Sequence, residues 1–333
     1  MDQGTQSESR TVGGYFSTFP VMAIPPLHPK IRAMLDAEGP FPPPDTLAVA
    51  EVRAVREGMM LRRPKLNEPV ARVDDRAIRF ADGKIPVRIY TPHGSGMHPV
   101  LVYFHGGGWV LGSLETHDGV CRSLSHRAGC VVASVDYRRA PEHKFPAALE
   151  DCSAAVTWCA EHAAEIRGDG TRLAIAGDSA GGNLAAALAL AIRDKGGPRL
   201  ALQVLIYPVT NYEFNTASYH EYATGYGLTR DSMWYFWRSY LPTPTEGGYP
   251  YASPLLAKDL GGLPPALVLT AQYDVLRDEG EAYAARLAQS GVPVRCTRFL
   301  ELNHGFVQLA AVCEPASRGL QEIAEALRSS WSR

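Results

Sequence analysis

A serine between two glycines is the first pattern in this chain that could perform chemistry. Residues 173–183 read Leu-Ala-Ile-Ala-Gly-Asp-Ser-Ala-Gly-Gly-Asn, so an apolar run ends at Gly177 and an alanine-rich helical stretch begins at Leu184. A Gly-x-Ser-x-Gly turn between a strand and a helix holds its serine in a strained backbone conformation. The pattern predicts that Ser179 is a nucleophile, with the amide of Ala180 directed at charge that develops beside it. Glycine and serine also mark ordinary turns, so the pentapeptide alone does not settle its role.

Three consecutive glycines lie upstream, in the segment His105-Gly106-Gly107-Gly108-Trp109, directly after an apolar run. Such a triplet is expected where the backbone must approach another group closely. At the end of a strand its amides can complete, with Ala180, an oxyanion hole for a carbonyl oxygen. A flexible loop is the alternative, and the bulky residues on both sides argue against it.

An acid and a base follow downstream. Asp274 comes just after an apolar run, and His304 follows the last such run in the segment Asn-His-Gly-Phe. The order serine, acid, histidine, each at the end of a strand, predicts a triad in which His304 takes the proton of Ser179 and Asp274 orients the imidazole. An aspartate after a strand can instead cap a helix, a role that Asp278 or Glu279 could also fill.

The elements that must position these residues alternate between strands and helices. Strands are predicted at 77–81, 85–91, 100–104, 131–135, 173–176, 202–207, 266–270 and 294–299. Helices are predicted at 116–128, 145–162, 184–195, 279–290 and 317–330. The first two strands flank Asp82-Gly83 and form a hairpin. Strands that are apolar throughout indicate a mainly parallel sheet covered on both faces, which is an α/β fold.

Two segments interrupt this alternation. Residues 1–72 are broken by prolines, with helical pieces expected at 30–38 and 45–60, and should pack over another part of the chain. Nearly sixty residues separate the strands that end at 207 and begin at 266, and they contain a helix that Thr229 could cap. One face of this helix either packs into the core or forms a lid over the site: Met233, Phe236, Trp237 and Tyr240, with Tyr219, Tyr222 and Tyr226 nearby.

Composition narrows the possible partners. The chain has 333 residues, of which 46% are hydrophobic and 20% charged, and its net charge of −2 gives no reason to expect nucleic acid or an anionic membrane. No run of eighteen apolar residues is present, so no membrane span is expected, and the polar residues 1–10 favour a cytoplasmic location over secretion. The six cysteines lack Cys-x-x-Cys spacing, which predicts free buried thiols and neither a metal site nor a disulfide framework.

The motifs together resemble those of the hormone-sensitive-lipase-like carboxylesterases of the α/β-hydrolase superfamily, also called bacterial lipase family IV. They are His-Gly-Gly-Gly-Trp at 105–109, Asp-Tyr-Arg-Arg-Ala-Pro-Glu at 136–142, Gly-Asp-Ser-Ala-Gly-Gly-Asn at 177–183, the segment 274–280, and His-Gly-Phe at 304–306. The resemblance spans residues 74–310. Arg139 stands where the family usually has leucine and Val275 where it often has proline, and neither departure removes a catalytic group.

This resemblance implies an α/β-hydrolase fold with a mainly parallel eight-stranded sheet, helices on both faces and a helical cap. The cap would comprise residues 1–72 and 209–251, and the catalytic core residues 73–208 and 252–333. It implies a triad of Ser179, Asp274 and His304, and an oxyanion hole of Gly107, Gly108 and Ala180 with Gly106 as a further candidate. The candidates for contact with substrate are His105, Trp109, Asp178, Tyr207, Tyr226 and Trp237. It implies no cofactor and no metal, and a homodimer paired through the last strand.

The favoured hypothesis is a serine carboxylesterase that hydrolyses small-molecule esters of short to medium acyl length through an acyl-serine intermediate. Amide hydrolysis, as by an arylformamidase, would use the same triad and stays open. Dehydratase or lyase chemistry is found in relatives whose nucleophile is replaced, and Ser179 argues against it. Non-catalytic receptors of this fold lose the histidine, whereas His304 is present.

Overall fold

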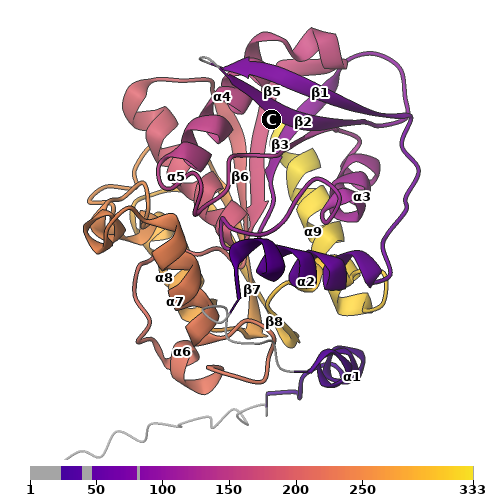
Figure 1. Cartoon of the computed structure of the whole chain (residues 1–333). Coiled ribbons are helices and arrows are strands. Elements are labelled where there is room, and N and C mark those ends of the chain that lie inside the picture. The colour runs from indigo at the N-terminus through magenta and orange to yellow at the C-terminus, as the bar shows by residue number, and fades with distance from the viewer. Residues whose placement is uncertain (1–23, 40–46, 81–82, 333) are drawn as a thin grey trace, which may run out of the picture.

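Eight strands pair into one sheet in the computed structural model, which describes residues 24–39, 47–80 and 83–332. Their order across the sheet is β1-β2-β4-β3-β5-β6-β7-β8 (Figure 1). β1 pairs antiparallel with β2 and β2 with β4, and all pairs from β4 to β8 are parallel, which confirms the predicted sheet. The strands are β1 Arg72–Phe80, β2 Gly83–Thr91, β3 His98–Phe104, β4 Val131–Val135, β5 Gly168–Asp178, β6 Leu200–Ile206, β7 Ala266–Tyr273 and β8 Val294–Asn303.

Alternate residues of the central strands enter two hydrophobic cores on opposite faces of the sheet. On β3, Val100, Val102 and Phe104 belong to one core, whereas Leu101 and Tyr103 belong to the other, and all five side chains are fully buried. The first core is covered by α4 (Ala147–Glu161), α5 (Ala180–Lys195) and α8 (Arg277–Gln289), and the second by α3 (Asp118–Ala128) and α9 (Glu314–Trp331). Helices therefore cover both faces, which is why these strands are apolar along their whole length (Figure 1).

The predicted helical pieces near the N-terminus are α1 (Pro29–Glu38) and α2 (Val49–Arg62). α1 is attached to the end of β8, where the amide of His28 donates to the carbonyl of Glu301 at 2.9 Å. α2 is attached through Arg53, whose guanidinium donates to the carbonyls of Val110 and Ala140 at 2.9 Å each. Residues 1–23 and 40–46 of the predicted cap segment lie outside the described residues, and its division from the core at residue 72 stays a prediction.

The long insertion after β6 contains α6 (Ala217–Glu221) and α7 (Arg230–Tyr240). Thr229 caps α7 as predicted, because its hydroxyl oxygen accepts from the amide of Ser232 at 3.0 Å. The predicted apolar face of α7 is buried throughout. The limits 209 and 251 of the predicted cap insertion stay predictions. Short 3₁₀ helices occur at Ala163–Ile166, Pro244–Gly248, Pro254–Leu256 and Phe306–Leu309.

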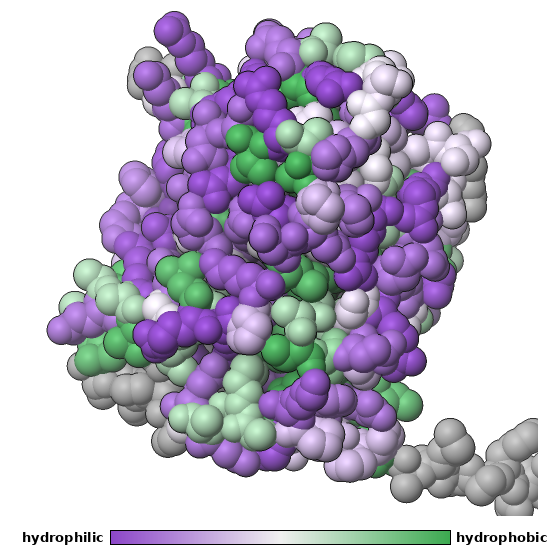
Figure 2. All heavy atoms as spheres, turned by 90° about the vertical axis from the view of Figure 1, so that its right-hand side faces the viewer, coloured by the Kyte–Doolittle hydropathy of each residue, from purple (hydrophilic) through white to green (hydrophobic). Residues whose placement is uncertain are grey.

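All six cysteines are free, and five of them are buried. Cys296 is exposed, so the prediction of a buried thiol is wrong there, because it lies on the edge strand β8. Exposed large hydrophobic side chains are scattered over several elements, and Figure 2 shows a mostly hydrophilic face on which hydrophobic residues form small separate groups. Within the described part of the chain, no helix combines the length and the apolar character needed to cross a membrane.

Candidate active site

The sharp turn between β5 and α5 carries Ser179. Its φ of 57° and ψ of −118° lie outside the helical and strand regions, a strain of about 1–3 kcal/mol that neighbouring contacts must hold. Gly177 and Gly181 make those contacts possible, because a Cβ on Gly177 would collide with the carbonyl of Gly181, and one on Gly181 with the carbonyl of Phe104. The amide of Ser179 donates to the carbonyl of Ile206 at 2.8 Å, which ties the turn to β6.

Ser179, His304 and Asp274 lie in one hydrogen-bonded chain. Nε2 of His304 is 2.9 Å from Oγ of Ser179, and Nδ1 is 2.7 Å from Oδ2 of Asp274. The three residues follow β5, β8 and β7, so the carboxyl ends of three parallel strands meet at this point of the sheet edge. Asp274 is 1% exposed, and its Oδ1 accepts from the amide of Leu276 at 2.9 Å. The buried carboxylate keeps a proton on Nδ1, so Nε2 presents its lone pair to the serine hydroxyl.

The glycine loop after β3 lies beside this chain of residues. Gly107 and Gly108 have φ values of +124° and +60°, a region of backbone space that favours glycine. Among the described residues, neither of these two amides donates to a protein acceptor outside the loop. The amide of Gly106 is different, since it donates to Oδ1 of Asp178 at 2.9 Å. The prediction of Gly106 as an oxyanion donor is therefore wrong, and Gly107, Gly108 and Ala180 stay as the candidate donors.

A cavity of about 160 Å³ contains Ser179, His304 and the glycine loop. Its walls come from α1, α2, α7 and the loops that precede α7 and follow β8. Most of the wall is apolar, with two arginines and one glutamate from the N-terminal helices. The lining side chains outside the catalytic segments are Met34, Leu35, Glu38, Arg56, Met59, Met60, Arg63, Leu111, Leu228, Phe236, Gln308 and Leu309.

Two tryptophans that were predicted to contact substrate do not line this cavity. Trp109 is fully buried, with its ring stacked on Tyr240 at 4.1 Å and tilted against Trp237 at 4.7 Å. The prediction is wrong for both residues, because α7 packs their rings into the core behind the glycine loop. His105 is also buried, stacked on Tyr137 at 4.3 Å, and supports the loop from within.

Two predicted tyrosines are likewise absent from the residues that line the cavity. The ring of Tyr207 packs against the imidazole of His304, with 4.6 Å between centroids, so it supports the base from behind. Tyr226 stacks on Tyr273 at 5.0 Å. Of the six candidates for contact with substrate, Asp178 alone borders the cavity.

Among the described residues, Phe236 is the residue of α7 that lines the cavity; the sequence had placed it on a face that either packs into the core or forms a lid. Its ring lies over Gly108 so closely that a Cβ on this glycine would collide with it. The lid interpretation and the core interpretation of α7 therefore both hold, for different residues of the same face. The sequence contains both the triple glycine and the aromatic helix, but nothing in it indicates that the two are in contact.

The N-terminal helices contribute charge as well as apolar wall. Arg63, the residue directly after α2, donates from Nε and Nη2 to the carboxylate of Glu38 of α1, at 2.9 and 2.8 Å, which ties the helices together beside the cavity. Burial lowers the pKa of Arg56 to about 10, and repulsion from Arg63 adds to this effect. These residues were missed because the proline-broken segment shows no pattern that marks a binding wall.

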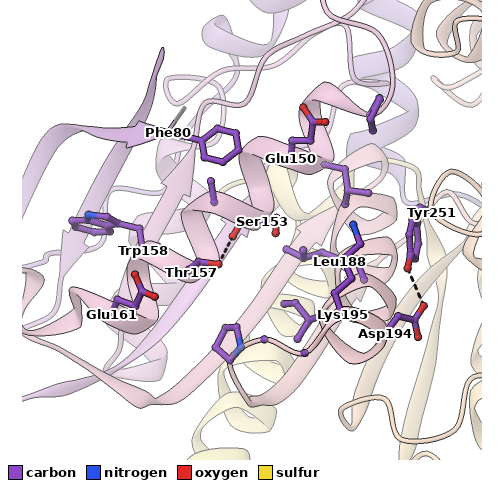
Figure 3. Close-up of a pocket in the computed structure, with 18 of the residues that line it drawn as sticks. Phe80, Glu150, Ser153, Thr157, Trp158, Glu161, Leu188, Asp194, Lys195 and Tyr251 are labelled. Carbon is purple, nitrogen blue, oxygen red and sulfur yellow. Dashed lines mark hydrogen bonds between the residues drawn. The ribbon is translucent and has the colours of Figure 1, made fainter. Parts of the chain in front are cut away.

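Larger hollows of the surface lie away from Ser179. A groove of about 960 Å³ is bounded by α4, α5, the tip of β1 and residues 249–251, with Phe80, Leu188 and Tyr251 along it (Figure 3). Two hydrogen bonds join labelled residues of this groove: Thr157 donates to the carbonyl of Ser153 at 3.0 Å, and the hydroxyl of Tyr251 donates to Asp194 at 2.9 Å. Over the described residues, no cluster of three histidines, cysteines or carboxylates could hold a metal ion. The smaller cavity therefore remains the candidate active site.

Comparison with known proteins agrees with this geometry. A family model described as alpha/beta hydrolase fold matches residues 101–308. Carboxylesterase NlhH of Mycobacterium tuberculosis is 40% identical over 322 residues, covering 94% of this chain and all of that protein. Esterase structures superimpose closely on this chain. One from Pyrobaculum calidifontis has a TM-score of 0.86 at 45% identity, covering 91% of this chain and 99% of the chain in that structure. An esterase structure from Pseudomonas putida has a TM-score of 0.88 at 38% identity, covering 92% of this chain and 98% of the chain in that structure. The chain therefore belongs to the hormone-sensitive-lipase-like family of α/β hydrolases.

Proposed function

We propose that the chain is a serine carboxylesterase that hydrolyses esters of short to medium acyl length. The observation that carries the proposal is the hydrogen-bonded chain from Ser179 through His304 to Asp274, in a cavity bordered by the glycine loop. The names of the relatives support the ester class, since they include a carboxylesterase and an ethyl acetate hydrolase of Pseudomonas putida, 38% identical over 283 residues.

In the proposed reaction, Oγ of Ser179 attacks the ester carbonyl while Nε2 of His304 takes the hydroxyl proton. The negative charge that forms on the carbonyl oxygen is stabilised by the amides of Gly107, Gly108 and Ala180. Asp274 stabilises the imidazolium. When the tetrahedral species collapses, the C–O bond to the alcohol breaks and His304 returns the proton to the leaving alkoxide. A water molecule then repeats the two steps on the acyl serine and releases the acid.

The size of the cavity supports a short acyl chain. About 160 Å³ holds a few carbon atoms beside the ester group, and each methylene buried in an apolar wall contributes about 0.8 kcal/mol. Longer chains must extend past Met34, Leu35 and Met59 of the N-terminal helices, which line the cavity. We therefore expect activity to rise over the first few methylenes and then to fall.

A rate series on p-nitrophenyl esters of increasing acyl length, beside a formanilide, tests this proposal. Fast turnover of short esters and slow turnover of the anilide are expected, and Ser179→Ala should abolish ester turnover. Fast anilide hydrolysis with slow ester hydrolysis would favour the amidase alternative. Near-normal ester turnover by Ser179→Ala would refute the acyl-serine mechanism.

Two further expectations belong to the proposal. Among the described strands, β8 lies at the edge of the sheet and pairs with β7 alone, so a second copy could pair there and form the homodimer implied by the family resemblance. Size-exclusion chromatography with light scattering, compared between the wild type and a variant with proline inside β8, tests it. A cytoplasmic location is also proposed, and cell fractionation tests it.

A further inference from the structure

Asp274 of the proposed triad is held in place by a neighbouring peptide group. Its Oδ2 lies 2.7 Å from Nδ1 of His304, and its Oδ1 accepts from the amide of Leu276 at 2.9 Å. This amide belongs to the peptide group that joins Val275 to Leu276. The direction in which Asp274 presents its carboxylate to His304 therefore depends on how that peptide group is fixed.

The other end of the same peptide group is bonded to the long insertion after β6. Its oxygen, the carbonyl of Val275, accepts from the hydroxyl of Ser218 at 2.7 Å. Ser218 lies on α6, 57 residues before Val275, and both residues are fully buried. One chain of hydrogen bonds therefore runs from Ser218 through the peptide group, Asp274 and His304 to Ser179.

The hydroxyl of Ser218 has no freedom to turn away from this carbonyl. A serine hydroxyl offers one proton and two lone pairs. The proton is used on Val275, so the oxygen accepts from the amide of Asp278 at 3.3 Å and from the hydroxyl of Thr216, which is 3.1 Å away. The backbone of Ser218 is fixed as well, because its amide donates to Oδ2 of Asp278 at 2.8 Å.

These contacts also hold the start of α8, which follows Asp274 directly. The N-cap position of this helix is Leu276, whose side chain cannot accept from the first amides of the helix. Ser218 supplies an acceptor from another part of the chain, because its hydroxyl oxygen accepts from the amide of Asp278, the second residue of α8. The same hydroxyl thus fixes the peptide group before the helix and the first turn of the helix itself.

The hydroxyl affects Asp274 in two ways. Linked hydrogen bonds polarise one another, so a carbonyl that accepts a bond makes the N–H of its peptide group a stronger donor to Oδ1. Without the hydroxyl, the buried carbonyl of Val275 would lose its donor, which favours a turn of the peptide group toward another one. Such a turn would move the amide of Leu276 away from Oδ1 and release the carboxylate from its present direction.

We propose that Ser218 is a positioning residue that holds Asp274 toward His304 through the peptide group between Val275 and Leu276. The insertion after β6 then has two roles, since its helix α7 lines the cavity through Phe236 and its helix α6 fixes the acid. The kinetic part of this inference rests on the proposed esterase function, whereas the positioning of Asp274 does not.

Kinetics on p-nitrophenyl butyrate test the role of the hydroxyl. Ser218→Ala should lower kcat about 10-fold with KM nearly unchanged, because a small displacement of a catalytic group slows the reaction without weakening binding. Ser218→Cys keeps a weaker donor and should have a kcat between those of the wild type and Ser218→Ala.

Ser232→Ala is the matched control, because it makes the same chemical change in the same insertion. Ser232 is buried on α7, and its hydroxyl is 2.8 Å from that of Thr229. Its loss should lower the stability in urea but leave kcat within about threefold of the wild type, as expected for a residue outside the chain of bonds to Asp274. Equal losses of kcat in Ser218→Ala and Ser232→Ala would show a merely structural role and overturn the proposal.

A proton signal tests the position of Asp274 without any substrate. The hydrogen between Nδ1 of His304 and Oδ2 of Asp274 should give a far-downfield signal in the full-length protein, identified by its loss in His304→Gln. In Ser218→Ala this signal should shift upfield or exchange away, whereas in Ser232→Ala it should stay. An unshifted signal in folded Ser218→Ala would overturn the proposal. A shifted signal in a protein without ester turnover would refute the proposed function and leave the positioning of Asp274 supported.

A double-mutant cycle tests whether Ser218 acts through Asp274. In the Asp274→Asn background the carboxylate that Ser218 positions is already gone, so adding Ser218→Ala should lower kcat hardly further. A further loss as large as that of Ser218→Ala alone would show that Ser218 acts by another route, and this result would also overturn the proposal.

Discussion

Asp274→Asn is a sharp test of the proposed triad, because the structure dictates how the new amide must sit. Oδ1 of Asp274 accepts from the amide of Leu276 at 2.9 Å, and Oδ2 lies 2.7 Å from Nδ1 of His304. In the variant the amide oxygen must stay on the Leu276 N–H, so its NH₂ group faces Nδ1. An NH₂ group only donates, and therefore the imidazole proton must move to Nε2.

With the proton on Nε2, His304 presents a donor to Ser179 instead of a lone pair, and general-base catalysis is lost while the shape of the site is kept. The equivalent change in a serine protease lowers kcat about 10⁴-fold, or about 5.5 kcal/mol of transition-state stabilisation. We expect a loss of this size for hydrolysis of p-nitrophenyl butyrate, with KM nearly unchanged. Stopped-flow measurement of the first turnover should place the loss in acylation of Ser179.

Asp278→Asn is the matched control, because it makes the same chemical change four residues along. Asp278 accepts from the amide of Ser218 at 2.8 Å and pairs with Arg277, without contact to His304. Its kcat should stay within about threefold of the wild type, as expected for a residue outside the reacting groups. A folded Asp274→Asn enzyme that keeps a tenth of the wild-type kcat would refute the tautomer argument.

Three other changes give separate tests. Phe236→Ala should shift the preferred acyl chain to greater length, with a gain of about fourfold in kcat/KM for each methylene newly accommodated. Met233→Ala, on the same helix but away from the cavity, should leave the preference unchanged in the p-nitrophenyl ester series. Equal shifts in the two variants would contradict the assignment of Phe236 to the cavity wall. Arg53→Met should lower the free energy of unfolding in urea by about 2 kcal/mol, because two buried carbonyls lose a charged donor. Glu142→Ala should lower it by less than about 1 kcal/mol, because this carboxylate is half exposed. A larger loss in Glu142→Ala than in Arg53→Met would contradict this explanation of the contacts of Arg53. Burial raises the pKa of Glu279 to about 8, so the folded state binds a proton that the unfolded state releases above its ordinary pKa near 4.5, and this contribution to stability is lost as pH rises toward 8. The melting temperature of Glu279→Gln relative to the wild type should therefore rise between pH 6 and pH 9, and a difference independent of pH would show that the carboxyl group does not titrate there.

The sequence was sufficient to predict the sheet and the triad, because both depend on local patterns. Apolar runs such as 100–104 can only be strands buried on both faces, and residues placed just after parallel strands must meet at one edge of the sheet. Ser179, Asp274 and His304 therefore come together whatever the details of the loops. The glycines of the loop at 105–109 were informative for the same reason, since their spacing reports backbone contacts rather than side-chain packing.

The sequence was insufficient to predict which side chains border the cavity. Trp109 and Trp237 were predicted to contact substrate, yet their rings pack against each other in the core. Phe236, one position from Trp237, reaches the cavity because a helical step of about 100° directs it toward Gly108. The hydrogen bond from the amide of Gly106 to Asp178 was equally hidden, since 72 residues separate the two and only the fold brings them together.

The structure separates the parts that set the reaction from the parts that set the substrate. Backbone contacts permitted only by glycine hold the nucleophile turn against the end of β3 and the oxyanion loop against Asp178. The walls contributed by α1, α2 and α7 border the site with side chains such as Met34, Met59 and Phe236. A change in the first group moves the reacting atoms and must lower kcat for every ester. A change in the second group alters the space around the acyl chain, so its effect must depend on the ester and be smallest for acetate, which fills least of the cavity.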